Sequence, residues 1–153
     1  MGRAQQLVAA VEATGAGAFV ADTAPIIYRV ERSADARLVA ACDPLFDAVE
    51  ADELGCLVST VSVAELLIEP FRVGPAAVSA VDAFLRQPLL GIAEVDEDIA
   101  RTAAELVARE RVGRLPDALI AATGLRYGIP IVTGDRRLAR GLSAGALLVG
   151  DYR

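Results

Sequence analysis

The amino-acid sequence of 153 residues contains no histidine, no lysine, no asparagine and no tryptophan, and all 15 of its basic residues are arginine. Without histidine the chain can form no Ser-His-Asp triad and no zinc site with imidazole ligands. Without lysine it has no Walker A phosphate-binding loop and no Schiff base. These absences exclude several common kinds of enzyme chemistry and turn attention to carboxylates and arginines.

Cysteines and long apolar runs are scarce as well. Cys42 and Cys56 stand in segments typical of an apolar helix and an apolar strand, so both are expected to fill the core. No apolar run approaches the roughly 18 residues of a membrane span. Near the N-terminus, Gln5, Gln6 and Glu12 interrupt the stretch that a signal peptide would keep apolar. The sequence therefore predicts a cytoplasmic protein with no membrane segment.

Short apolar segments alternate with helical patterns along the chain. An N-terminal extension, residues 1–17, has helical spacing over 5–13 and ends in a glycine-rich break. Beyond it we expect five strands, at 18–21, 56–59, 90–94, 131–133 and 146–149. The helices expected between them lie at 23–31, 44–53, 61–69, 76–86, 96–111, 116–126 and 136–142, with Pro70 ending the third. Uniformly apolar strands separated by helices are typical of a parallel sheet covered on both faces. The predicted fold class is therefore α/β, with a five-stranded parallel sheet sandwiched between helices.

Four acidic residues occupy positions where such a sheet binds ligands. Asp22 and Asp135 follow apolar strands, Glu65 lies in the helix after another strand, and Asp117 lies in the first turn of a helix. Open parallel sheets bind ligands at the carboxyl ends of their strands, so the four acids are expected at one edge. Three of them also have a purely structural explanation, as helix caps, turn residues or partners of a helix dipole. Glu65 fits that explanation least, because its helix is apolar on nearly every side.

Four converging carboxylates would repel one another unless a cation lay between them. A set of oxygen ligands without histidine or cysteine suits a hard ion, Mg²⁺ or Mn²⁺, which keeps several waters and bridges to phosphate. Metal-assisted hydrolysis of a phosphodiester is the enzymatic chemistry that these residues support best. Asp96 is also acidic, but it is best explained as the cap of the helix that follows it.

The segments around the four acids resemble a known family. Residues 20–25, 59–67, 115–123 and 131–138 are similar, in order and spacing, to the four acidic motifs of PIN-domain ribonucleases, and above all to those of VapC toxins from bacterial toxin–antitoxin pairs. The resemblance implies a PIN nuclease domain over 18–153 and a Mg²⁺-dependent endoribonuclease that cleaves RNA. It also implies that Asp22, Glu65, Asp117 and Asp135 are the catalytic and metal-binding acids. One departure is the extension, since VapC-like chains usually reach their first aspartate within a few residues.

Partners follow from the same resemblance and from composition. The family likeness implies a VapB-like antitoxin. A mean hydropathy of +0.44 predicts exposed apolar surface, which a homodimer within a larger toxin–antitoxin complex would cover. Both partners are expectations at this point.

Neighbouring side chains complete the predicted site. Thr23 and Thr133 are expected to orient the carboxylates. Arg114, Arg136 and Arg137 are expected to contact RNA phosphates, because guanidinium groups bind phosphate through two hydrogen bonds. The chain as a whole carries a net charge of −6, which is unusual for an RNA-binding protein, and the arginines could equally form an ordinary solvated face. A catalytically degenerate PIN domain that binds RNA or protein without cutting therefore stays open as the alternative.

Overall fold

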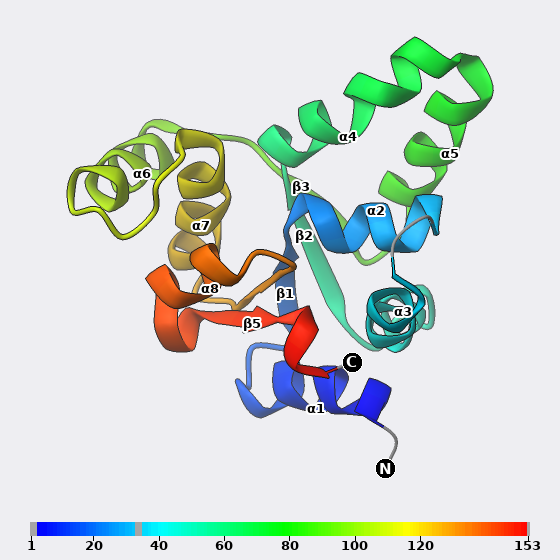
Figure 1. Ribbon diagram of the computed structural model, residues 1–153, viewed down its shortest axis with the longest axis horizontal. Helices are drawn as coiled ribbons and strands as arrows, with labels where there is room; N and C mark the ends of the chain where they lie inside the picture. Colours follow the sequence, from blue (N-terminus) through cyan, green and yellow to red (C-terminus); the bar gives the residue numbers. More distant parts are fainter. Residues whose placement is uncertain (1–2, 33–34, 153) are drawn as a thin grey trace.

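The computed structural model describes residues 3–32 and 35–152 and contains a five-stranded, all-parallel sheet with helices on both faces (Figure 1). The strands lie in the order β3-β2-β1-β4-β5. Their bounds are Ala18–Ala21 for β1, Gly55–Ser59 for β2, Leu90–Ala93 for β3, Ile131–Thr133 for β4 and Ala146–Leu148 for β5. The predicted fold class is confirmed.

Alternate side chains of the central strand enter two separate cores, because successive residues of a strand point to opposite faces of the sheet. Phe19 and Ala21 of β1 belong to one core and Val20 to the other, and all three are fully buried. The first core lies under α1 (Arg3–Ala13), α2 (Thr23–Glu31), α3 (Ala36–Glu50) and α5 (Pro75–Leu85). The second lies under α6 (Glu97–Ala108), α7 (Leu115–Tyr127) and α8 (Arg136–Leu142). Burial on both faces explains why the central strands are almost uniformly apolar, whereas the edge strand β3 exposes Gly91 and Ile92.

Aromatic contacts and the N-terminal helix reinforce the first core. The ring of Phe46 meets those of Phe19 and Phe84 edge to face, with centroids 6.0 and 5.4 Å apart. Leu7 and Val11 of α1 are fully buried in the same cluster. The helix before the sheet is thus packed into the domain. Cys42 and Cys56 are free and buried here too, as the sequence predicts.

Two helices extend several residues beyond one of their predicted ends, and each contains an internal proline. The helix α3 begins at Ala36, ahead of Pro44, and α4 (Thr60–Val73) continues past Pro70. An internal proline removes one backbone hydrogen bond. Packing outweighs that loss, because α3 buries side chains on both sides of Pro44 and Pro70 is itself buried. The expectation that Pro70 ends its helix is wrong; α4 ends instead at Gly74, whose φ of 138° favours glycine.

The order of the strands places a topological switch point at the carboxyl end of β1. From β1 the chain builds β2 and β3 on one side, and it then crosses over to build β4 and β5 on the other. Connections on the two sides therefore leave the sheet in opposite directions at the boundary between β1 and β4, which is where open α/β sheets bind ligands. At this boundary the backbone N–H of Asp22 donates to the carbonyl oxygen of Val132 at 3.0 Å.

In the part of the chain that the structure describes, no helix is both long enough and apolar enough to cross a membrane.

Candidate functional site

Asp22 lies directly after β1 and forms the N-cap of α2. Its side chain is buried, with 7% of the residue exposed. Its Oδ1 accepts a hydrogen bond from the backbone N–H of Thr23 at 2.8 Å, and its Oδ2 accepts one from the hydroxyl of Thr133 at 2.6 Å. Burial raises the pKa of Asp22, the two hydrogen bonds oppose that effect, and the charges of Glu65 and Asp135 raise the pKa further. A buried carboxylate in such surroundings is a candidate for binding a cation.

Glu65 is held beside Asp22 by a hydrogen bond between two helices. It lies in α4, and its Oε2 accepts a hydrogen bond from the hydroxyl of Thr23 at 2.5 Å. Because Thr23 follows Asp22 in the chain, this bond fixes α4 against the start of α2. The two threonines singled out in the sequence thus each contact one carboxylate, Thr23 that of Glu65 and Thr133 that of Asp22.

Asp117 approaches the same place from another helix. It is half-buried in the first turn of α7. Burial is the main cause that raises its pKa; Arg114 lowers the pKa, and the charges of Asp22, Asp135 and Glu65 raise it. Since the other three acids all act on Asp117, the fold brings the four carboxylates of the predicted quartet to one edge of the sheet.

Asp135 is the most exposed of the four, and it caps α8. Its Oδ1 accepts hydrogen bonds from the backbone N–H groups of Arg137 and Leu138 at 2.7 and 3.3 Å. Its own N–H donates to the hydroxyl of Thr133 at 2.9 Å. The capping explanation and the convergence of the acids are therefore both true. The N-termini of α2, α7 and α8 meet at this edge, and their positive dipole ends favour the carboxylates there.

The carboxylates do not form a ready-made metal cage. Among residues 3–32 and 35–152, no three acidic or cysteine side chains stand close enough together to hold an ion as they are placed. Four of the carboxylate oxygens instead accept hydrogen bonds from the threonines and from backbone N–H groups.

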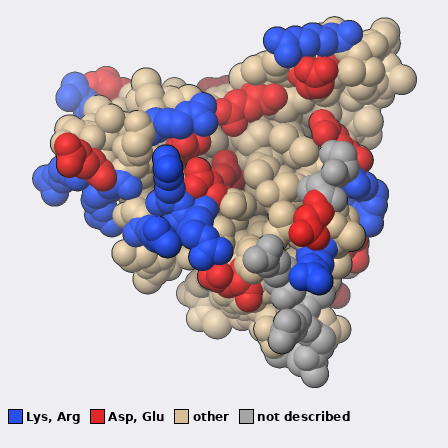
Figure 2. Space-filling view, in the orientation of Figure 1, with Lys and Arg blue, Asp and Glu red and all other residues tan. Residues whose placement is uncertain are grey.

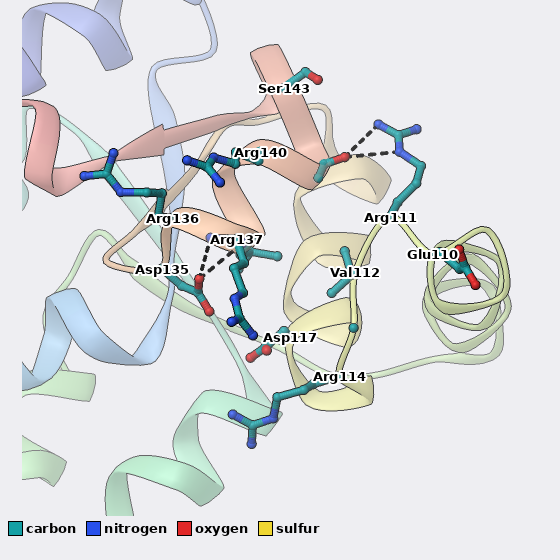
Figure 3. A pocket seen from close by; sticks show the side chains of 13 residues that line it. Glu110, Arg111, Val112, Arg114, Asp117, Asp135, Arg136, Arg137, Arg140 and Ser143 are labelled. Carbon is teal, nitrogen blue, oxygen red and sulfur yellow. Dashed lines mark hydrogen bonds between the residues drawn. The ribbon is translucent and has the colours of Figure 1, made fainter.

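A groove of about 1060 Å³ opens beside Asp117 and Asp135 (Figure 3). Five exposed arginines from the α6–α7 loop and α8 line it: Arg111, Arg114, Arg136, Arg137 and Arg140. Figure 2 shows a cluster of basic side chains on this side of the molecule, next to acidic ones. The three arginines predicted to contact phosphate therefore share one groove with two of the acids, and Arg140 joins them.

One close contact that shapes the groove has no sequence signal. The guanidinium of Arg111 donates to the carbonyl oxygen of Gly141 from Nε and Nη2, at 3.1 and 3.0 Å (Figure 3). A side chain at Gly141 would overlap the carbonyl oxygen of Arg111. The absence of a Cβ thus lets the α6–α7 loop lie directly on α8, and the two arginine-bearing segments are fixed to each other. Arg109, by contrast, pairs with Glu105 and lies outside the groove lining.

The family model of the PIN domain matches residues 19–141. This is most of the chain, and the protein belongs to the PIN-domain family, as its four acidic motifs predict. Among curated proteins, none is similar enough in sequence to count as a relative.

Solved structures share this fold at low sequence identity. One is a toxin–antitoxin complex from Klebsiella pneumoniae, with 19% identity and a TM-score of 0.63 over 86% of this chain and 97% of the other. Another is VapBC2 from Rickettsia felis bound to a DNA fragment from their promoter, with 18% identity and a TM-score of 0.66 over 85% and 96% of the two chains. A third is FitAcB from Neisseria gonorrhoeae, with 21% identity and a TM-score of 0.63 over 86% and 98%.

Proposed function

We propose that this PIN-domain protein is a metal-dependent endoribonuclease. The observation that carries the proposal is the convergence of Asp22, Glu65, Asp117 and Asp135, from four segments of the chain, at the switch point of the sheet and beside an arginine-lined groove. RNA is proposed as the substrate because the motifs around these acids resemble those of PIN-domain ribonucleases.

Mg²⁺, or Mn²⁺ in its place, fits the chemistry of these side chains. The donors are all carboxylate oxygens, the chain contains no histidine, and its two cysteines are buried in the core. Asp22, Glu65 and Asp117 would hold the ion, directly or through water, and Asp135 would complete the site. When bound, a divalent ion neutralises charge on the scissile phosphate and lowers the pKa of a nearby water.

The protein's own residues orient the ligands and the substrate. Thr133 and Thr23 hold the carboxylates of Asp22 and Glu65, so these groups keep their direction without rearranging when substrate arrives. The groove offers five arginines against three acids to the phosphates of a bound strand. This local excess of positive charge explains how a protein of net charge −6 could bind a polyanion.

A toxin role, with a VapB-like antitoxin, is part of the proposal. Of the structural neighbours named above, one is described as a toxin–antitoxin complex and another is VapBC2; FitAcB shares the same fold. Large apolar side chains are exposed on α4, where Ile68, Phe71 and Val73 are 53%, 69% and 70% exposed. Apolar surface of this kind is typical of a protein interface and supports burial by an antitoxin or a second copy of the chain. The cytoplasm is the proposed place of action.

A cleavage assay with one matched control tests the activity. Wild type, Glu65→Gln and Glu69→Gln would be incubated with end-labelled single-stranded RNA in Mg²⁺, in Mn²⁺ and in excess EDTA. Glu69 lies one turn further along α4 and is exposed. We expect cleavage by wild type and Glu69→Gln only when metal is present, and none by Glu65→Gln. Undiminished cleavage in EDTA would contradict the metal-dependent mechanism.

A second candidate function is a PIN domain that binds RNA or protein without cutting. It is favoured by the absence, within the described residues, of three acidic side chains close enough to hold an ion as they stand. In the same assay this candidate predicts RNA retention by wild type with no cleavage in any metal.

A further inference from the structure

Tyr28 and Gly134 meet next to the acidic site. Tyr28 lies in α2, and Gly134 lies in the turn between β4 and α8. A Cβ placed on Gly134 would stand 2.7 Å from the hydroxyl oxygen of Tyr28, 3.4 Å from its Cζ and 3.3 Å from the Cβ of Ala24. A distance of 2.7 Å is shorter than such contacts allow, so the tyrosine hydroxyl occupies the space that a side chain at position 134 would need.

Space, and not backbone conformation, is what requires glycine here. The glycines with positive φ in the described chain are Gly15, Gly17, Gly74 and Gly128, and Gly134 is not one of them. Alanine could therefore adopt the backbone conformation of residue 134. The closest obstacle to alanine is the hydroxyl oxygen of Tyr28; the Cβ of Ala24 and the Cζ of Tyr28 are the next atoms, at 3.3 and 3.4 Å.

The turn that Tyr28 contacts carries two residues that form hydrogen bonds within the acidic site. Gly134 stands between Thr133, whose hydroxyl binds Asp22 at 2.6 Å, and Asp135, whose N–H binds the same hydroxyl at 2.9 Å. A shift of a few tenths of an ångström at Gly134 would alter both hydrogen bonds. Tyr28 is well placed to limit such a shift, because its ring is partly buried against the first core and its helix starts at Asp22.

We propose that Tyr28 is a positioning residue for the acidic site: its hydroxyl supports the turn at Gly134 and so keeps Thr133 in contact with Asp22. The inference rests on the proposed metal site. It adds a residue from outside the four acidic motifs and assigns its role to one atom, the hydroxyl oxygen. A purely structural role would need only the ring, and phenylalanine would serve equally well.

A size-swap cycle tests the role of that atom. The variants are Gly134→Ala, Tyr28→Phe and the double variant, with Tyr127→Phe as a control on the exposed end of α7. Gly134→Ala adds a methyl group against the hydroxyl, and Tyr28→Phe removes the hydroxyl and leaves a gap. In the double variant the new methyl group takes the space that the hydroxyl leaves. We expect each single variant to weaken Mn²⁺ binding, Gly134→Ala about tenfold or more and Tyr28→Phe a few-fold, and the double variant to recover most of the wild-type affinity.

Two readouts separate the outcomes. Calorimetric Mn²⁺ binding and metal-free thermal melts would be measured for every variant, and RNA cleavage would then be compared with Mn²⁺ affinity. Recovery in the double variant, but not when Gly134→Ala is combined with Tyr127→Phe, supports the inference. Should Gly134→Ala fail to fold, recovery of a cooperative melt in the double variant supports it equally.

The inference is overturned if wild type binds Mn²⁺ and Gly134→Ala binds it as well, or if the double variant is no better than Gly134→Ala. If wild type binds no Mn²⁺, the proposed metal site fails first and this inference fails with it.

Discussion

Replacing Asp117 with asparagine would show whether Asp117 is a metal ligand or only a negative charge in the first turn of a helix. Asp117 is half-buried in the first turn of α7, and burial together with the charges of Asp22, Asp135 and Glu65 raises its pKa. In the metal-free protein, ionisation of Asp117 therefore lowers the stability of the folded state, and Arg114 offsets only part of this effect. Asparagine keeps the size of the side chain and removes the charge.

The two roles predict opposite changes in stability. A charge that only complements the helix dipole contributes about 0.3–1 kcal/mol, so its loss would lower the melting temperature of the metal-free protein. If Asp117 is instead a metal ligand that the neighbouring carboxylates repel, its replacement should leave the melting temperature of the metal-free protein unchanged or raise it. If the wild type binds Mg²⁺, a concentration a hundred times the dissociation constant would stabilise it by about 2.7 kcal/mol. For a chain of 153 residues, unfolding entropy averages about 0.3 kcal/mol/K, so the stabilisation corresponds to about 8 °C.

Thermal melts with and without Mg²⁺ would measure both effects. If the substitution weakens Mg²⁺ binding a hundredfold, the same concentration should raise the melting temperature by only about 1 °C. Asp98→Asn is the matched control, because Asp98 lies in the first turn of α6 and is exposed. An Asp117→Asn protein that melts lower without metal, keeps the full Mg²⁺ shift and still cleaves RNA would refute a role for Asp117 in metal binding.

Three further outcomes are expected. Because the folded-state pKa of Asp117 is raised, its ionised form destabilises the folded protein above that pKa, and the destabilisation disappears as the pH falls toward 3.8. In melts with EDTA, any gain in melting temperature from Asp117→Asn should therefore shrink from pH 7 to pH 4. Thr133→Val should weaken Mn²⁺ binding measured by calorimetry, whereas Thr133→Ser, which keeps the hydroxyl at Asp22, should not. Leu7→Ala should lower the free energy of unfolding by about 2–5 kcal/mol in urea titrations and leave the Mg²⁺ shift intact, because Leu7 is fully buried in the first core, away from the groove; equal stability would show that α1 is not part of that core.

The strands and most of the helices could be predicted because their signals are local. The helix α2 spans Thr23–Glu31 as expected, since Asp22 caps it and Pro25 sits in its first turn. The start of α3 could not be predicted in this way, because Pro44 resembles the beginning of a helix. The part of α3 ahead of Pro44 is supported by tertiary contacts: Asp43 pairs with Arg29 of α2 and with Arg32, the residue that caps the C-terminus of α2, at 3.0 Å each. Contacts between helices leave no periodic signal in either segment.

That the four acids lie near one another, with Thr23 and Thr133 beside them, could be predicted from the sequence, but which carboxylate each threonine contacts could not. Asp22 and Asp135 follow strands, Asp117 lies in the first turn of a helix, and Glu65 lies in the helix that follows β2. A parallel sheet brings these positions toward one edge. The bond from Thr133 to Asp22, however, joins residues 111 positions apart, and it depends on how β1 and β4 align. The need for glycine at positions 134 and 141 could not be predicted from the sequence either, because it depends on the atoms of Tyr28 and Arg111 that pack against them in the fold.

Calorimetric titration with Mn²⁺ tests most directly whether the four acids form one metal site. It would be carried out on the wild-type protein and on four variants: Asp22→Asn, Glu65→Gln, Asp117→Asn and Asp135→Asn. The account predicts saturable binding to the wild type and weakened binding to every one of the four variants, with Glu69→Gln and Asp98→Asn binding as the wild type does. Wild-type protein that binds no divalent ion, or four variants that bind Mn²⁺ as tightly as the wild type, would contradict it.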